Sequence, residues 1–183
     1  MEKRERIITA LLYSIFITYI FLLIKILFLS RVSLTELFHN ERTVVRSINL
    51  VPFRSILAYI SGSSDTVRRF AFVNVAGNIA IFIPLGIYLP LFKRDKRVFV
   101  NLLFILIASI IVEIIQGLFG IGVSDIDDII LNTLGGFIGV IGYKFLLSIL
   151  GKEKKVCILI TILSVIIGLP GVLYFLFMIK MRF

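Results

Sequence analysis

The chain has 183 residues, of which 59% are hydrophobic, and it has a mean hydropathy of +1.07 and a formal net charge of +9. Soluble domains are only about 45–50% apolar, and the excess here comes in blocks of about 20 residues, the length that spans a bilayer. Composition therefore excludes an ordinary soluble domain and predicts an all-α polytopic membrane bundle of about five transmembrane helices. Its basic residues flank the apolar blocks, which favours lipid headgroups and membrane topology over a nucleic-acid partner.

The first apolar block, residues 7–29, follows a basic N-terminus and is longer than the apolar core of a signal peptide. We expect it to be a retained membrane span. A polar connection follows at 31–69. Its basic residues other than His39 are all Arg, whose planar side chain pairs well with phosphate and carboxylate groups. Within it, residues 47–60 predict a short helix that begins at Pro52 and is better suited to the membrane interface, or to a re-entrant segment, than to spanning.

Further spans are expected at residues 70–92, 98–119, 127–150 and 156–179. The basic segments 93–97 and 144–155, together with the basic N-terminus, are predicted to lie on the cytoplasmic side. In the fourth span Gly135 and Gly139 form a GxxxG pair, which favours close packing against another helix.

Polar side chains interrupt the apolar blocks at one end of three spans, and the predicted topology places all of them toward the extracytoplasmic side. Carboxylates and amides at membrane depth are costly unless they pair, bind a ligand or react. The residues concerned are Asn74, Asn78, Glu113, Gln116, Asp125, Asp127, Asp128 and Asn132.

Three interpretations of this polar group remain open. The amides and acids could hold helices together, at about 1 kcal/mol or less per hydrogen bond, with Asp127 and Asp128 acting as helix caps. They could instead form a headgroup site, in which the acids hold a divalent cation or Glu113 acts as a general acid or base. An ion or proton path through Glu113 is the third interpretation, although the inner halves of the spans are apolar.

Four separated motifs resemble the VanZ-like family: NLVPF (49–53), NVAGNIAIFIPLG (74–86), EIIQ (113–116) and DIDDIILNTLGG (125–136). The resemblance covers about residues 7–150. Members often carry an arginine in the turn before the aspartates, where this chain has residues 120–124, GIGVS. The family pattern falls on Asn49, Pro52, Phe53, Asn74, Asn78, Pro84, Gly86, Glu113, Gln116, Asp125, Asp128, Asn132 and Gly135.

The resemblance implies a multi-pass protein of the bacterial cytoplasmic membrane, and the distribution of Lys and Arg predicts that its N-terminus lies in the cytoplasm. We expect a VanZ-like four-helix membrane domain at 1–150 with the outer loop 31–69. The additional transmembrane helix expected at 151–183 lies outside the resemblance. The namesake of the family is associated with resistance to teicoplanin, a glycopeptide that binds cell-wall precursors. The expected role is therefore in the cell envelope, and no reaction is implied.

We therefore expect an extracytoplasmic site that binds, and in one version modifies, a lipid or a lipid-linked cell-wall precursor. The alternatives are a non-enzymatic binding or structural membrane protein, or an ion-coupled transporter that uses Glu113. The candidate catalytic acids are Glu113, Asp128 and Asp125, and a divalent cation at these acids is the candidate cofactor. The candidate binding residues are Asn49, Phe53, Arg54, Asn74, Asn78, Gln116, Asp127 and Asn132.

Overall fold

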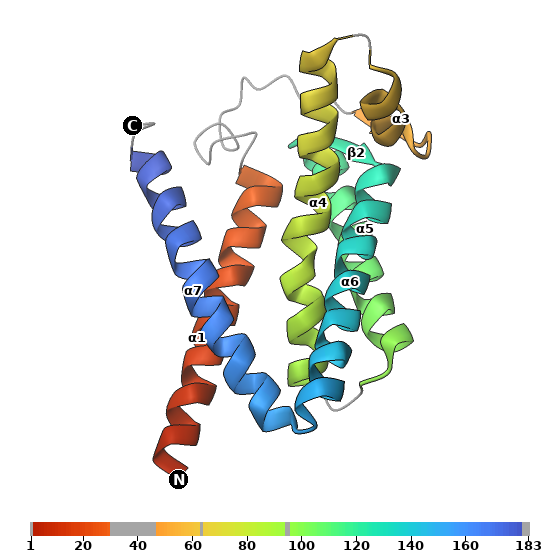
Figure 1. The fold of residues 1–183 in the computed structure, drawn as a ribbon. Helices are drawn as coiled ribbons and strands as arrows, with labels where there is room; N and C mark the ends of the chain where they lie inside the picture. The colour runs from red at the N-terminus through yellow and green to blue at the C-terminus, as the bar shows by residue number, and fades with distance from the viewer. Residues whose placement is uncertain (1, 30–46, 63, 94–95, 181–183) are drawn as a thin grey trace. The chain divides into compact units, whose positions relative to one another are not determined.

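A computed structural model describes residues 2–29, 47–62, 64–93 and 96–180, and it confirms an all-α chain (Figure 1). Two three-residue strands, β1 (Ser47–Asn49) and β2 (Val123–Asp125), accompany the helices. The helices are α1 (Glu2–Leu29), α3 (Arg54–Ser61), α4 (Asp65–Phe92), α5 (Val98–Phe119), α6 (Ile126–Leu150) and α7 (Glu153–Lys180).

Four of the described helices are long and apolar enough to cross a membrane, which makes the chain a multi-pass membrane protein. They are α1, over Glu5–Phe28, and the whole of α4, α5 and α6. Helix α7 has 28 residues, but its side chains from position 171 onward lie outside the described ones. A fifth span in α7 therefore stays a prediction. Much of the outer connection also lies outside the described residues, at positions 30–46.

The chain divides into two compact units. One unit comprises residues 1–26 and 145–183, in which Lys154 of α7 forms a salt bridge with Glu5 of α1. The other unit comprises residues 27–144 and contains α3, α4, α5, both strands and most of α6. All the polar residues singled out in the sequence belong to this second unit.

Of the described helices only α5 begins at the predicted residue, and for α3 and α4 the structure shows why the start differs. Helix α4 starts at Asp65, five residues earlier than expected, because Ser64 caps it by accepting the Val67 N–H at 3.3 Å. The short helix α3 starts at Arg54 instead of Pro52, since Phe53 adopts a left-handed conformation with φ of 64° that cannot belong to the helix. The prediction of a short helix in this segment is otherwise confirmed.

The segment before the aspartates, expected to be a short flexible turn, contains strand β2. It pairs in parallel with β1, and Asn49 lies opposite Asp125 in the register. Such a pairing between segments more than 70 residues apart leaves no local pattern in the sequence, because three residues are too few to show a strand period. The pairing brings the NLVPF segment against the start of α6.

Helices α4 and α6 cross with their backbones in contact. A Cβ atom placed on Gly135 would lie 2.1 Å from the carbonyl oxygen of Ile79, and one on Gly139 would lie 2.1 Å from that of Ile83. Such distances leave no room for any side chain, so only glycine permits this approach. The close packing predicted from the GxxxG pair is confirmed, and it sets the distance between α4 and the start of α6.

Replacing these glycines tests the crossing. We expect Gly135→Ala and Gly139→Ala each to destabilise the protein by about 1–3 kcal/mol, the usual cost of forcing extra carbon into a packed contact. Thermal unfolding in detergent micelles measures the effect. Gly142→Ala is the matched control, because a Cβ there meets nothing within 4 Å. Equal stability of all three variants would contradict the proposed contact.

Candidate functional site

Asp125 connects four elements of the unit. Its Oδ1 accepts the Asp127 N–H at 2.9 Å, which caps the start of α6, and its Oδ2 accepts from Asn49 Nδ2 of β1 at 3.0 Å. Its own backbone N–H donates to Glu113 Oε2 of α5 at 2.8 Å. The Asp125 carboxylate and backbone therefore hold β1, β2, α5 and α6 together at one point.

The turn between β1 and α3 is also hydrogen-bonded to the start of α6. Phe53 N–H donates to Asp127 Oδ1 at 2.5 Å, which helps to hold Phe53 in its unfavourable left-handed conformation. Asn49 Oδ1 accepts from Val51 N–H at 3.4 Å and lies 3.5 Å from Arg54 Nη1. Strained backbone conformations persist where neighbouring groups determine them, and here those groups belong to the candidate site.

Asp128 forms the second centre of the site. Its Oδ1 accepts from Asn78 Nδ2 at 2.5 Å and from Asn74 Nδ2 at 3.4 Å. The two amides lie one turn apart on α4, as the sequence spacing predicted, and both face the carboxylate of α6. The close approach of α4 and α6 at the glycines brings this acid within reach of both amides.

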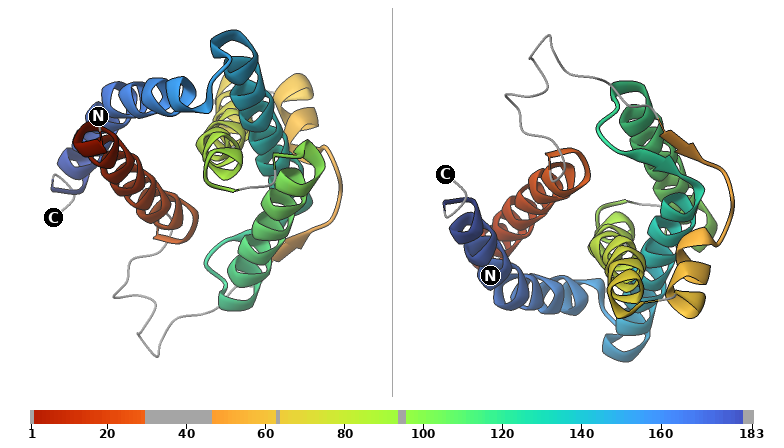
Figure 2. Two further views of the ribbon diagram at one scale, coloured as in Figure 1. Left: turned by 90° about the horizontal axis from the view of Figure 1, so that it is seen from below. Right: turned by 90° about the horizontal axis from the view of Figure 1, so that it is seen from above.

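An open pocket of about 620 Å³ is lined by residues that include Asp125 and Asp128. Five of the predicted site residues contribute its polar lining: Asn49, Arg54, Asn74, Asp125 and Asp128. The remaining lining residues are Ser47, Ile48, Ala58, Val67, Phe70, Ala71 and Val123. The pocket therefore draws on β1, α3, α4, β2 and α6, and the β1–α3 segment lies at the edge of the α4–α6 helices in Figure 2.

The other predicted site residues lie outside the pocket lining. Glu113 is 3% exposed and contacts the site through the Asp125 backbone. Gln116 Nε2 donates to the Leu27 carbonyl oxygen at 2.8 Å, and Asn132 Nδ2 donates to Ser109 Oγ at 3.0 Å. Asp127 holds the β1–α3 turn through its bond to the Phe53 backbone. A catalytic role for Glu113 stays a prediction.

Two buried polar residues of α5 were missing from the predicted site. Ser109 and Asn101 are both fully buried, and Asn101 Nδ2 donates to the Arg97 carbonyl oxygen at 2.8 Å. Their signal was in the sequence, because 101, 105, 109 and 113 recur every four residues and share one helix face with Glu113. Ser109 belongs to the α5–α6 contact, whereas Asn101 lies near the opposite end of α5.

A divalent cation shared by three of the acids does not fit the described side chains. Within the described residues, no three His, Cys, Asp or Glu side chains are placed so that they could share a metal ion. The oxygens of Glu113, Asp125 and Asp127 instead accept backbone N–H groups. The arrangement offers a ligand fixed carboxylates, amides and one guanidinium.

Removal of the Asp125 side chain tests its structural role. We expect Asp125→Ala to destabilise the protein by about 1–2 kcal/mol, because a helix cap is lost and Asn49 loses its acceptor. Asp65→Ala is the control, since Asp65 is an exposed first-turn acid of α4. Thermal unfolding compares the two, and an Asp125→Ala loss no larger than that of Asp65→Ala would contradict the assignment.

Comparisons with known proteins bear on the same residues. A family model described as VanZ/LLP1 matches residues 15–149, a range that contains the whole pocket lining. Protein VanZ of Enterococcus faecium is 33% identical over 124 residues, which cover 67% of this chain and 69% of that protein. No solved structure matches the chain.

Proposed function

This chain belongs to the VanZ/LLP1 family, and we propose that it is a cell-envelope membrane protein that binds the headgroup of a lipid or of a lipid-linked cell-wall precursor. The observation that carries this proposal is the pocket, in which five polar side chains from five elements meet at one end of the membrane helices. Its volume of about 620 Å³ is in the range of small-ligand sites, about 300–1,000 Å³.

The polar lining suits a headgroup that combines a phosphate with hydrogen-bond donors. Arg54 supplies a planar guanidinium, which pairs well with phosphate oxygens. Asp125 and Asp128 supply carboxylates, which accept hydrogen bonds from hydroxyl or ammonium groups. Asn49 and Asn74 add amides with both donor and acceptor atoms. Asparagine side chains already donate hydrogen bonds to both carboxylates, so these acceptors are held in place before a headgroup binds.

The pocket is proposed to face outward from the bacterial cytoplasmic membrane. The basic residues of the N-terminus and of segments 93–97 and 144–155 favour the cytoplasmic side. The pocket is built from the first turns of α4 and α6, which are the ends opposite to those basic segments. The proposed orientation supports contact between the polar lining and outer-leaflet headgroups.

Binding is the role that the geometry supports best. Glu113 contacts Asp125 and is absent from the pocket lining, which favours a positioning role over a path for ions. The resemblance of the motifs to the family extends the proposal to the cell wall: a protein that binds such a headgroup would change how the surface responds to teicoplanin-type glycopeptides. Asp125 and Asp128 are the acids available to a bound headgroup.

Binding is tested by native mass spectrometry of the purified protein with phosphatidylethanolamine, phosphatidylglycerol and an undecaprenyl-linked wall precursor. We expect saturable binding of at least one of them and a loss of roughly tenfold or more in Asp128→Asn and Arg54→Ala, because a hydrogen bond to a charged group contributes about 1.5–3 kcal/mol. Arg69→Ala is the control, since Arg69 is exposed and outside the lining. Equal affinities in all variants would contradict the site, and a new product mass would reveal catalysis.

Orientation is tested by cysteine labelling in intact cells, in a Cys157→Ser background that removes the chain's single cysteine. Ser61→Cys lies at the exposed end of α3, and Lys152→Cys lies in the exposed basic segment between α6 and α7. A membrane-impermeant maleimide is expected to label position 61 from outside and position 152 only after lysis. The reverse pattern would overturn the outward orientation.

A further inference from the structure

The pocket has a polar floor and an apolar rim. The floor residues Asn49 and Asp128 are each 8% exposed. The rim is formed by Ile48, Val67, Phe70 and Val123, which are 67%, 43%, 73% and 39% exposed. Exposed apolar groups around a site mark contact with something other than water. A ligand in this pocket therefore meets exposed apolar side chains as well as the polar floor.

The length of α4 places this rim at the edge of the hydrocarbon. Its 28 residues extend for about 42 Å at about 1.5 Å per residue, against a hydrocarbon core of about 30 Å. A centred helix therefore leaves roughly 6 Å, or about four residues, outside the core at each end. Phe70 then lies just inside the hydrocarbon boundary, and Asn74 lies about one turn deeper.

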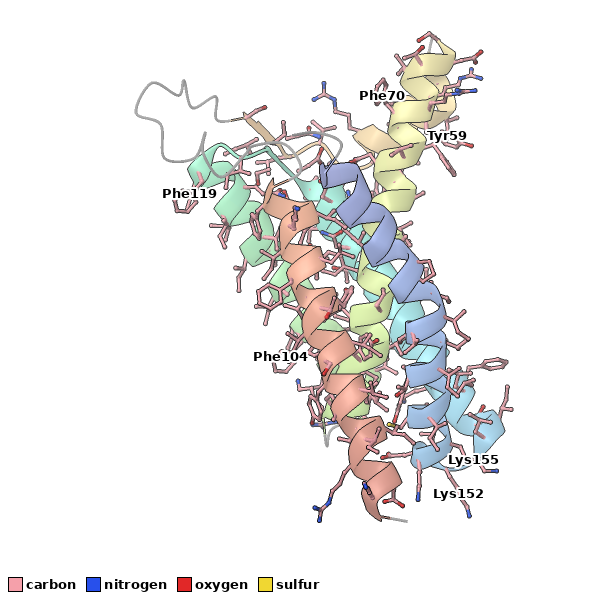
Figure 3. The ribbon with its side chains drawn as sticks, turned by 90° about the vertical axis from the view of Figure 1, so that its left-hand side faces the viewer. Tyr59, Phe70, Phe104, Phe119, Lys152 and Lys155 are labelled. Atoms are coloured by element: carbon pink, nitrogen blue, oxygen red, sulfur yellow. The ribbon has the colours of Figure 1, made fainter. Side chains whose placement is uncertain are left out.

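The segment next to the rim is apolar on its outer face as well. In α3 the side chains of Leu57 and Ile60 are 56% and 65% exposed and share one helix face, and Phe53, just before the helix, is 53% exposed. Helix α3 is held on α4 through Tyr59 and Phe72, whose ring centroids are 5.8 Å apart. Figure 3 shows Tyr59 and Phe70 at the same end of the structure. An amphipathic helix of this kind lies in the headgroup–acyl boundary.

We infer that the pocket opens sideways into the bilayer across the Ile48–Phe70 rim, and that its ligand is a membrane-resident amphiphile whose hydrocarbon chain stays in the outer leaflet against that rim. The inference rests on the proposed headgroup binding and adds the route by which the ligand enters and the place of its hydrocarbon chain. The polar headgroup descends from the boundary to Asp128, whose partners Asn74 and Asn78 lie about one and two helical turns below Phe70. A water-soluble sugar, nucleotide or peptide would gain nothing from the exposed apolar side chains.

Two properties of the pocket favour this occupant over a second protein. The exposed rim is continuous with the lining, so one molecule can contact both the apolar side chains and the carboxylates. In addition, Phe70 belongs to a helix that is long and apolar enough to span the membrane, which puts its surroundings in lipid. The rim side chains would then bind the hydrocarbon chain of the ligand, whereas Asp128 and Arg54 would bind its headgroup.

Photo-crosslinking in native membranes tests this without knowledge of the ligand. Benzoylphenylalanine replaces Phe70 on the rim or, as the matched control, Phe119, which is 61% exposed at the end of α5 and outside the lining. Mass spectrometry identifies the lipids attached at each position. We expect lipid adducts at both positions, with one headgroup class enriched severalfold at position 70 and the enrichment lost when Asp128→Asn is added.

The outcomes separate the inference from the proposed function. If position 70 gives no lipid adducts while position 119 does, the sideways opening is wrong, and headgroup binding from the aqueous side is still measurable by mass spectrometry. If position 70 gives the same lipid composition as position 119, with or without Asp128→Asn, the rim faces lipid but headgroup selection is wrong. Enrichment that Asp128→Asn abolishes supports both.

Discussion

The hydrogen bonds of Asp125 are the constraint on which the rest of the site depends. One carboxylate oxygen caps α6, the other holds Asn49 of β1, and the backbone N–H is held by Glu113 of α5. A carboxylate at membrane depth is costly without partners, and here β1 and α6 supply its donors. The same bonds place β1 beside β2 and carry Arg54 to the edge of the pocket.

The glycine crossing has a separate effect on the site. Because Gly135 and Gly139 let α6 lie against the α4 backbone, the short side chains of Asn74 and Asn78 reach Asp128. A wider crossing would separate these groups and leave a carboxylate without donors, which is costly in a low-dielectric environment. Packing of small residues and placement of polar groups are therefore linked in this fold.

Many of the unexpected polar residues hold parts of the protein together, so the interpretation that they stabilise the fold applies to several of them. Glu113, Asp127, Gln116 and Asn132 hold neighbouring backbone or side-chain groups. Asp125 and Asp128 have partners within the protein and also line the pocket. Supporting polar residues therefore hold the polar residues that line the pocket, as preorganised binding sites require.

The sequence by itself determined that the chain is a membrane protein, with four of its spans, the short α3 helix and the GxxxG contact. It also determined which residues form the polar group. These follow from block length, helical period and residue type, which are local properties. The resemblance of four motifs pointed to the family before any geometry was known. Boundaries were less accurate, because the Ser64 cap and the left-handed Phe53 depend on details of turn conformation.

Only the tertiary structure decided which polar residues line the pocket and which support it. The sequence treated Glu113 and Asp128 alike, since both are acids in apolar helices. Pairing of β1 with β2 separated them, because it placed the Asp125 backbone over Glu113 and left Asp128 open to the pocket. Contacts between segments so far apart arise from the packing of the whole unit, and no local pattern encodes them.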